Sequence, residues 1–385
     1  MKYNWNVKRL DDIAEFNPRE TIKKGSVAKK IAMDVLQPFT RDVPSFEVTE
    51  FNGGTKFRNG DTIMARITPC LENGKTAKVS ILNEDEVGFG STEYIVFRAK
   101  EVIDEDYLYY LVCSPTVREP AIKSMVGSSG RQRVQTDVVK GLEISVPPYE
   151  EQIKIGKLLK DLDDKIRLNN EINKNLEQQA IALYKANFID FVPYDGKMPS
   201  SWRQGTVSEI IEIHDSKRIP LSNRERSDLD KIYPYYGATS IMDYVDKYLF
   251  DGIYLLLAED GTVMDDRGYP ILQYVEGRFW VNNHAHILTG KNGYTVELLY
   301  LLFKLTNVKS IITGAVQLKI SQANLRNLRV VIPTQADLRE FDAIIQPLFS
   351  EIRNLRAENQ QLSAIRDSLL PKLMSGEINV ANIDL

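Results

Sequence analysis

Residues 149–186 read YEEQIKIGKLLKDLDDKIRLNNEINKNLEQQAIALYKA, and this stretch decides the fold. Its seam positions recur at alternating spacings of four and three residues, which is typical of a coiled coil. They are Ile155, Leu159, Leu162, Ile166, Asn169, Asn173, Leu176, Ala180 and Leu183. The stretch therefore predicts one helix of roughly 35 residues, or ~50 Å at 1.5 Å per residue.

The same seam returns between residues 336 and 370, at an offset of 186 residues from Ile155 to Phe341. Its positions are Phe341, Ile345, Leu348, Ile352, Leu355, Asn359, Leu362, Arg366 and Leu369. A short apolar strand that a proline ends precedes each helix, over 142–147 and 328–333. The chain is therefore expected to be a tandem duplication in which each globular domain is followed by a long helix.

Landmarks of the first globular domain return in the second. Trp202 repeats Trp5, and three longer matches pair 208–212 with 11–15, 251–256 with 59–64, and 298–302 with 107–111. Buried strands are expected over 62–65 and 94–97, and a helix near 106–113. The predicted fold class is α+β. The expected parts are a first domain over 1–146, a helical spacer over 147–190, a second domain over 191–332, and a second spacer with the C-terminal tail over 333–385.

The two long helices are expected to pair with each other, because neither is apolar enough to be stable alone in water. A domain lies between them in the sequence, so the pairing should be antiparallel. That arrangement would give a rod with a globular domain at each end and a pseudo-two-fold axis. The alternative is that each helix packs on its own domain. The seam asparagines would fix the register, or they reflect imperfect packing.

Composition indicates the cellular compartment in which the protein is expected. Two cysteines, Cys70 and Cys113, favour a reducing compartment without a disulfide framework. The stretch Met1–Asn6 has no apolar core, so no signal peptide is expected, and no apolar run could span a bilayer. We therefore expect a cytoplasmic protein. The net charge of −4 weighs against a protein that coats DNA but allows local basic patches.

No catalytic motif is present in the sequence. Residues 69–76, PCLENGKT, lack the leading glycine of a phosphate-binding loop, and Gly88-Phe89-Gly90 lacks the third glycine of a dinucleotide fingerprint. The tetrapeptide of amino-methyltransferases is also missing. His284 and His286 could ligate a metal from one strand face, but no cysteine pair accompanies them, so a structural role is expected and no metal site is predicted.

Two loops in equivalent places favour contact with DNA. Residues 127–133, GSSGRQR, precede the first long helix as residues 314–319, GAVQLK, precede the second. Arg66 and Lys75 bracket a turn in the first domain, and Lys217-Arg218 marks the second. Arginine, lysine and amide side chains are those that contact phosphates and base edges. The alternative for each cluster is an ordinary solvated surface.

Four segments carry a resemblance to the specificity subunits of type I restriction-modification systems. Residues 147–153, PPYEEQI, are similar to the entry of the family's conserved helix, and residues 182–191, ALYKANFIDF, to its exit. Residues 369–378, LLPKLMSGEI, resemble the C-terminal tail, and residues 67–75, ITPCLENGK, resemble a loop of target-recognition domains. Residues 333–338 depart from the family because they lack the Glu-Gln of the first copy.

The resemblance implies a non-catalytic subunit in which each domain reads one half of a bipartite site in double-stranded DNA. It also implies two methyltransferase subunits that dock on the helices and bind S-adenosylmethionine, and motor-nuclease subunits that use ATP and Mg²⁺, with no cofactor on this chain. The expected DNA contacts are Arg66, Thr68, Asn73, Lys75, Arg131, Gln132, Arg133, Lys217, Arg218, Gln317 and Lys319. The expected partner contacts are Gln152, Leu183, Phe188, Phe191 and Leu370.

Two rival functions remain open at this stage. One is a DNA-independent scaffold, a coiled coil that carries two protein-binding heads, which the acidic composition favours. The other is a self-contained methyltransferase or nuclease, which the missing motifs disfavour. A salt-dependent DNA-binding assay with and without methyltransferase subunits separates the three.

Overall fold

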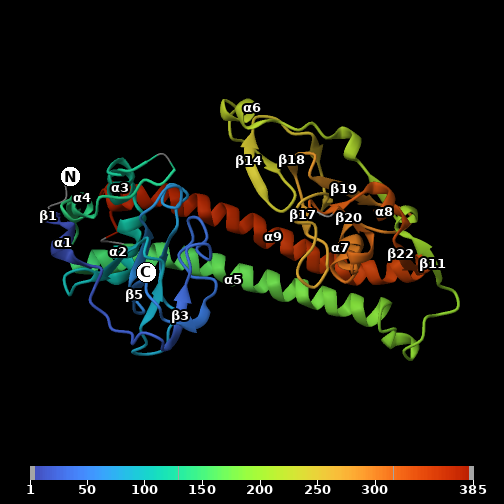
Figure 1. Cartoon of the computed structure of the whole chain (residues 1–385), viewed down its shortest axis with the longest axis horizontal. Helices are drawn as coiled ribbons and strands as arrows, with labels where there is room; N and C mark the ends of the chain where they lie inside the picture. Colours follow the sequence, from blue (N-terminus) through green and yellow to red (C-terminus); the bar gives the residue numbers. More distant parts are fainter. Residues whose placement is uncertain (1–4, 129, 315, 381–385) are drawn as a thin grey trace. The chain divides into compact units, whose positions relative to one another are not determined.

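Two compact units make up the chain. The computed structural model describes residues 5–128, 130–314 and 316–380. One unit comprises Met1–Asn170 and Arg356–Leu385, and the other comprises Glu171–Leu355. Each unit therefore combines one globular domain with half of each long helix, α5 (Tyr149–Phe188) and α9 (Gln335–Met374) (Figure 1). Both helices begin within one residue of the predicted start, and α5 ends two and α9 four residues later than predicted.

The globular part of the first unit is built on two four-stranded sheets and a closing strand pair. One sheet has the order β2-β9-β6-β7, with bounds Ala14–Phe16, Tyr94–Ala99, Thr62–Ala65 and Thr76–Lys78. The other has the order β4-β3-β8-β5, with bounds Glu47–Glu50, Val27–Ile31, Gly88–Gly90 and Thr55–Phe57. β1 (Asn6–Arg9) pairs with β10 (Glu143–Val146). The short helices are α1 (Leu10–Ile13), α2 (Glu105–Cys113), α3 (Pro115–Lys123) and α4 (Thr136–Lys140).

The second unit contains the same arrangement. One sheet has the order β12-β19-β16-β17, with bounds Ile211–Ile213, Ala285–Gly290, Tyr254–Ala258 and Leu272–Val275. The other has the order β14-β13-β18-β15, with bounds Ile241–Val245, Tyr233–Tyr236, Arg278–Val281 and Phe250–Asp251. The strand pairs are β11 (Arg203–Thr206) with β22 (Arg329–Ile332) and β20 (Ile312–Thr313) with β21 (Lys319–Ile320). The helices are α6 (Asn223–Ser227), α7 (Val296–Lys304), α8 (Gln322–Asn327) and 3-10 turns η1 (Val192–Tyr194), η2 (Val207–Glu209), η3 (Asp215–Lys217) and η4 (Lys309–Ile311).

Apart from the pair β20–β21, which has no counterpart among the described strands of the first unit, the two domains share their sheet topology, which confirms the predicted duplication. In each second sheet one internal pair is parallel, β3 with β8 and β13 with β18, and the neighbouring pairs are antiparallel. One predicted match was wrong by a residue. Arg66, directly after β6, accepts from Val134 N as Glu259, directly after β16, accepts from Ile320 N, so this strand is offset by 193 residues rather than by the 192 of the predicted match. The reason is one additional residue between the turn glycine, Gly252, and the second strand.

The long helices pair antiparallel. In the first unit Asp163 of α5 contacts Arg366 of α9, and Asn169 contacts Asn359, so numbers rise along one helix as they fall along the other. In the second unit the last residue of α5, Phe188, packs on Phe341 in the second turn of α9, with ring centroids 4.8 Å apart. The alternative in which each helix packs only on its own domain is therefore wrong, because each half contacts both a domain and the other helix.

Most predicted seam positions are buried or half-buried, with one exception near the end of α5. Leu183 is 38% exposed, and the neighbouring Tyr184 is buried in its place. Tyr184 and Phe188 lie four residues apart on one face and both pack on Phe341. The prediction for Leu183 was wrong because the helix here also covers the second domain, which requires a wider apolar face than a coiled-coil seam.

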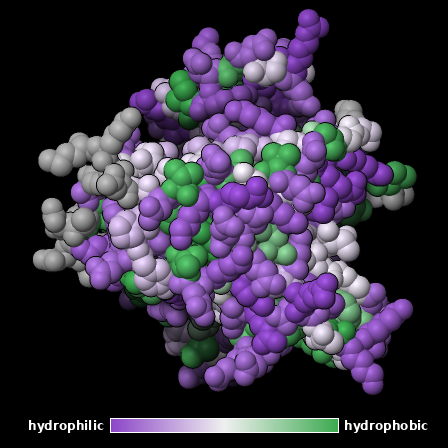
Figure 2. All heavy atoms as spheres, turned by 90° about the vertical axis from the view of Figure 1, so that its left-hand side faces the viewer, coloured by the Kyte–Doolittle hydropathy of each residue, from purple (hydrophilic) through white to green (hydrophobic). Residues whose placement is uncertain are grey.

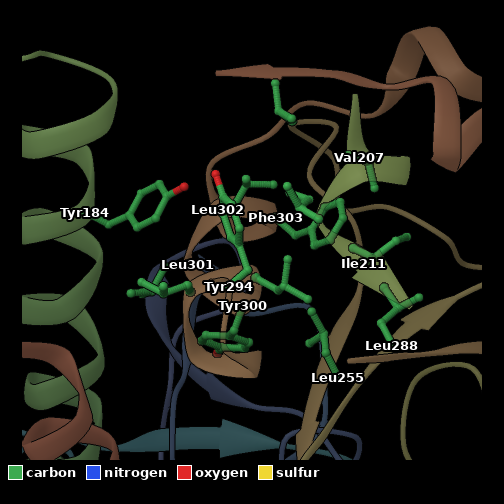
Figure 3. Close-up of a cluster of buried hydrophobic side chains, with 14 of the residues drawn as sticks. Tyr184, Val207, Ile211, Leu255, Leu288, Tyr294, Tyr300, Leu301, Leu302 and Phe303 are labelled. Atoms are coloured by element: carbon green, nitrogen blue, oxygen red, sulfur yellow. The ribbon is translucent and has the colours of Figure 1, made fainter. Parts of the chain in front are cut away.

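The core of the second unit lies between its first sheet and helix α7. Leu255 and Leu288 come from neighbouring strands, Leu302 and Phe303 come from α7, and all are buried. Tyr184 of α5 points toward the same cluster (Figure 3). Burial of each such side chain contributes ~1.5–3 kcal/mol, so these contacts stabilise the packing of the half-helices on the domain.

The seam asparagines are hydrogen-bonded to one another in the first unit. Asn169 is fully buried and donates to Asn359 at 2.9 Å and to Glu358 at 2.7 Å. Asn359 in turn donates to Asn170 at 2.9 Å. A one-turn slip of either helix would leave the buried amide nitrogen of Asn169 without these partners, so these contacts favour the observed register.

A buried ion pair joins both helices to the first domain. Asp163 accepts hydrogen bonds from Arg366 of α9 and from the hydroxyl of Tyr110 on α2, both at 2.6 Å. The side chains of Asp163 and Arg366 are only 7% and 11% exposed. Arg366 also pairs with Asp367 at 2.9 Å, but Asp367 is 62% exposed, so Asp163 is its buried counter-charge. Removal of a buried partner is strongly destabilising.

We expect Asp163→Ala to lower the free energy of unfolding by ~3 kcal/mol, because Arg366 then loses its buried partner. Asp161→Ala is the matched control, since Asp161 is 54% exposed and, among the described residues, pairs with Lys157 alone, one turn away. The control should change stability by less than ~0.5 kcal/mol. Urea unfolding followed by circular dichroism measures both. Equal effects of the two substitutions would contradict this role of the ion pair.

Hydrophilic side chains dominate the face shown in Figure 2, and the hydrophobic ones form small separate groups among them. None of the helices in the described residues combines the length and apolar character needed to cross a membrane.

Candidate nucleic-acid interface

The two predicted loop segments of the first domain meet. Thr68 N donates to the carbonyl of Gln132 at 3.0 Å, and Val134 N donates to the carbonyl of Arg66 at 2.8 Å. We call residues 66–75 and 126–133 the first loop pair. The first segment directly follows the buried strand β6, which gives the pair a rigid base. Ser129 belongs to the predicted loop but lies outside the described residues.

Arg133 is held by Glu93 at the rim of the first loop pair. The guanidinium donates through Nε at 2.9 and 3.0 Å and through Nη2 at 2.6 Å to the two carboxylate oxygens of Glu93. The hydrogen bond from Arg133 lowers the pKa of Glu93 below its ordinary value, so the carboxylate is ionised at neutral pH. Arg66 adds a second positive charge 3.9 Å from Glu93.

The remaining predicted residues of the first loop pair divide into two groups. Lys75 donates to the carbonyl of Met33 at 2.9 Å, and Thr68 donates to Glu72 at 2.9 Å, so both hold the loop itself. Three others form no side-chain hydrogen bond or ion pair with any described residue and are half-buried or exposed. They are Asn73, Arg131 and Gln132.

A polar hollow lies beside Arg66. Arg19, Lys56 and Thr92 line it together with Arg66. The sequence analysis did not identify Arg19 or Lys56, because each comes from a strand or turn that only the folded sheet brings next to the loop pair. Glu20 also lines the hollow but is already paired with Arg58 and Arg98. The three cationic side chains therefore leave an excess of positive charge, which favours an anionic ligand.

The second domain has a matching loop pair, residues 259–270 and 313–319. Gly261 N donates to the carbonyl of Leu318 at 3.0 Å, and Ile320 N donates to the carbonyl of Glu259 at 2.9 Å. Gly314 has a φ of +93°, and a Cβ there would lie 2.0 Å from a backbone oxygen, so only glycine fits this turn. Ala315 lies outside the described residues.

Glu259 is the centre of charge in the second loop pair. It accepts from Arg218 at 2.6 Å and from Lys319 at 3.2 Å. The side chain of Arg218 is only 13% exposed, whereas that of Lys319 is 49% exposed. Arg218 therefore supports the loop, and Lys319 reaches solvent. Lys217 and Gln317 are exposed and form no side-chain contact within the described ranges.

A buried polar network lies under the second loop pair. Asp215, Glu259 and His286 place potential metal-ligating atoms within 4.8 Å of one another. His286 Nδ1 lies 2.6 Å from Asp215, and Nε2 lies 2.8 Å from the carbonyl of Ile320. Both ring nitrogens of His286 are therefore engaged by groups of the domain itself. Burial acts to raise the pKa of Asp215, but His286, the backbone N–H of Ile287 and the charge of Arg218 together outweigh burial, so the pKa is lowered. These contacts hold His286 inside the domain, and His284 pairs with Asp260 at 2.6 Å.

The same backbone scaffold carries different charges in the two domains. Arg66 N donates to the carbonyl of Glu93 at 2.9 Å, as Glu259 N donates to that of His284 at 2.8 Å. Arg133 forms an isolated antiparallel β-bridge with Ile67, and Lys319 forms one with Asp260. The equivalent positions are Arg66 and Glu259, Glu93 and His284, and Arg133 and Lys319. The sequence analysis missed Glu93, which directly precedes the predicted strand 94–97, and Glu259, which directly follows β16. Both lie outside the basic loops.

The predicted partner contacts have different environments. Gln152 is 2% exposed and bonds to the backbone at residues 104 and 147. Phe188 is 7% exposed, and Phe191 is half-buried against Trp202. The structure therefore does not offer Gln152 or Phe188 to a partner, because both are used inside the chain. Leu183 is the most exposed of the set, and Leu370 is half-buried.

Comparisons with known proteins agree on one family. A family model described as the type I restriction modification DNA specificity domain matches residues 2–178 and again 199–364. The chain is 28% identical over 315 residues to the type I restriction enzyme MjaIX specificity subunit of Methanocaldococcus jannaschii, covering 74% of this chain and 71% of that protein. It is 21% identical to the HindI specificity subunit of Haemophilus influenzae, covering 83% and 87%. The crystal structure of the type I restriction-modification S subunit from M. genitalium superposes with a TM-score of 0.53 at 17% identity, covering 97% and 96%.

Proposed function

Because this chain belongs to the type I restriction-modification DNA specificity family, we propose that each of its two domains reads one half of a bipartite, asymmetric DNA sequence. Its role is DNA target recognition as the specificity subunit of a restriction-modification system. Specificity subunits are the non-catalytic components of such systems. The finer proposal concerns how this chain divides recognition between its domains and which residues contact DNA.

The observation that carries the proposal is that the loop pairs of the two domains share their backbone hydrogen bonds but carry different side chains at equivalent positions. In both domains a loop after a buried strand joins the loop before a long helix through equivalent backbone hydrogen bonds. A guanidinium stands at position 133 and an ammonium at the equivalent position 319. Since arginine and lysine present different donor geometries, two domains so equipped would read different half-sites.

The long helices would set the distance between the half-sites. Each helix has 40 residues, which corresponds to ~60 Å at 1.5 Å per residue. That length exceeds one turn of DNA, about 34–36 Å, so the helices can span half-sites on successive turns. We further propose that two methyltransferase subunits, which bind S-adenosylmethionine, dock on these helices. Motor-nuclease subunits that use ATP and Mg²⁺ would complete a cytoplasmic complex.

We expect the purified chain to transfer no methyl group to DNA, and to direct adenine methylation to one sequence once methyltransferase subunits are added. The reason is that target recognition and chemistry reside on different chains. Incorporation of labelled methyl groups into plasmid DNA measures both states. Methylation by the chain alone, in a preparation free of methyltransferase subunits, would contradict the proposal that recognition and chemistry reside on different chains.

The rival function is a DNA-independent scaffold with two protein-binding heads. The acidic net charge of −4 favours it, whereas the cationic hollow and the exposed cations of both loop pairs favour DNA. Binding of duplex DNA that weakens steeply with salt supports DNA recognition. Assembly with partners that leaves DNA binding undetectable at low salt would establish the scaffold instead.

A further inference from the structure

The guanidinium of Arg133 has one edge engaged and one edge free. Arginine carries five N–H donors in a fixed planar fork. Nε and Nη2 face the carboxylate of Glu93, with contacts of 2.6–3.0 Å. No described residue accepts a hydrogen bond from Nη1, and the side chain of Arg133 is 46% exposed. The end edge, formed by Nη1 and the second hydrogen of Nη2, is therefore directed away from Glu93 and remains accessible.

We propose that Arg133 recognises a guanine in the first half-site through this free edge, and that Glu93 is its positioning residue. The inference rests on the proposed function and deepens it by naming a residue and a base. Guanine presents the O6 and N7 acceptors in the major groove, which match two parallel N–H donors of arginine. Glu93 would fix the plane of the guanidinium before DNA arrives.

The neighbourhood of Arg133 favours a base over a phosphate. The Glu93 carboxylate lies beside the guanidinium and would repel a phosphate that approached the same group, whereas a base edge carries no net charge. An arginine held before binding also has less side-chain freedom to lose on binding. Arg131 has neither a neighbouring carboxylate nor a fixed side chain, because it is exposed and forms no side-chain contact with described residues. An arginine of this kind is suited to contact a phosphate of the DNA backbone.

The second domain provides an internal comparison. Lys319 occupies the position equivalent to Arg133 and is held by a single 3.2 Å contact with Glu259. An ammonium is a point charge without a planar fork. The second domain therefore lacks a held guanidinium edge at this place, and the guanine preference assigned to Arg133 is expected in one half-site only.

The test uses the full chain assembled with its methyltransferase subunits. Arg133→Lys, Arg133→Ala, Glu93→Gln and the control Arg131→Ala are each assayed on a library of duplexes that vary one base pair at a time. Binding is measured at several salt concentrations, and melting temperatures confirm folding. Arg133→Lys keeps the charge and Glu93→Gln keeps Arg133, so the two variants separate charge from geometry.

We expect both Arg133 variants to lose about tenfold or more of the preference for guanine at one position of the first half-site. Glu93→Gln should weaken the same preference several-fold with little change in the salt dependence, which a merely structural role would not produce. Arg131→Ala should leave every base preference intact and reduce the slope of log affinity against log salt by about one.

An unchanged base preference in Arg133→Ala, together with a flatter salt dependence, would overturn the inference and make Arg133 a phosphate contact. A lost preference for a base pair other than guanine–cytosine would overturn it as well. Failure of the wild-type complex to bind any duplex would instead contradict the proposed function, so the two failures are distinguishable.

Discussion

Exchange of residues 1–146 for the corresponding domain of another specificity subunit is expected to change one half of the methylated DNA sequence and leave the other half intact. β1 pairs with β10 and closes this domain immediately before α5 begins. The second domain has the equivalent strand pair, β11 with β22. The junction of the chimaera therefore lies at a feature common to both domains. The contacts of the loop pairs are internal to each domain. The second domain therefore keeps its own reading surface, and the position of methylated adenines shows the result.

The reciprocal exchange over residues 191–332 is the control, and it should change only the other half-site. In both chimaeras the incoming domain must keep the residues that contact the helices, such as the equivalents of Tyr110 and Tyr300. A chimaera that assembles with methyltransferase subunits but changes both half-sites would contradict independent reading by the two domains.

Insertion of one heptad into each long helix should lengthen the gap between half-sites without altering either half. Seven residues add ~10 Å at 1.5 Å per residue, which is about three base pairs at 3.4 Å each. Suitable points are after Asn170 in α5 and after Leu355 in α9, where the two units meet in the sequence. Sequencing of methylated sites measures the gap directly.

A heptad added to α5 alone is the matched control. It adds seven residues to α5 with no matching addition to α9, so the contact of Asn169 with Asn359 and that of Phe188 with Phe341 cannot both be kept in two continuous helices. Assembly and methylation should therefore fall sharply. A double insertion that leaves the gap unchanged would show that the helices do not set the spacing.

The long helices and the duplication could be predicted from the sequence because both depend on local, repeated patterns. The seam positions specify the helices, and strand 62–65 was predicted with its observed bounds. The position of Leu183 was wrong because a heptad count does not register that Tyr184 is drawn into the core of the second domain. The order of the sheets was not predicted, since strand pairing joins residues far apart in the chain.

The candidate site was predicted only in part, for a similar reason. The basic loops can be recognised from their residue types. Residue type alone does not distinguish Arg218, which is largely buried and pairs with Glu259, from Lys319, which is half exposed to solvent. Glu93 is forty residues from Arg133 in the sequence and carries no signal of its own there. Its role becomes visible only when the strand that follows it is placed beside the loop pair.

The most direct measurement of the central claim is a map of methylated adenines in DNA from cells that express this chain with its methyltransferase subunits, compared with cells that lack only this chain. The account predicts one bipartite motif with two different half-sites and a fixed gap, which disappears without the chain. A motif that persists in the absence of the chain, or that is continuous or palindromic, would contradict the account.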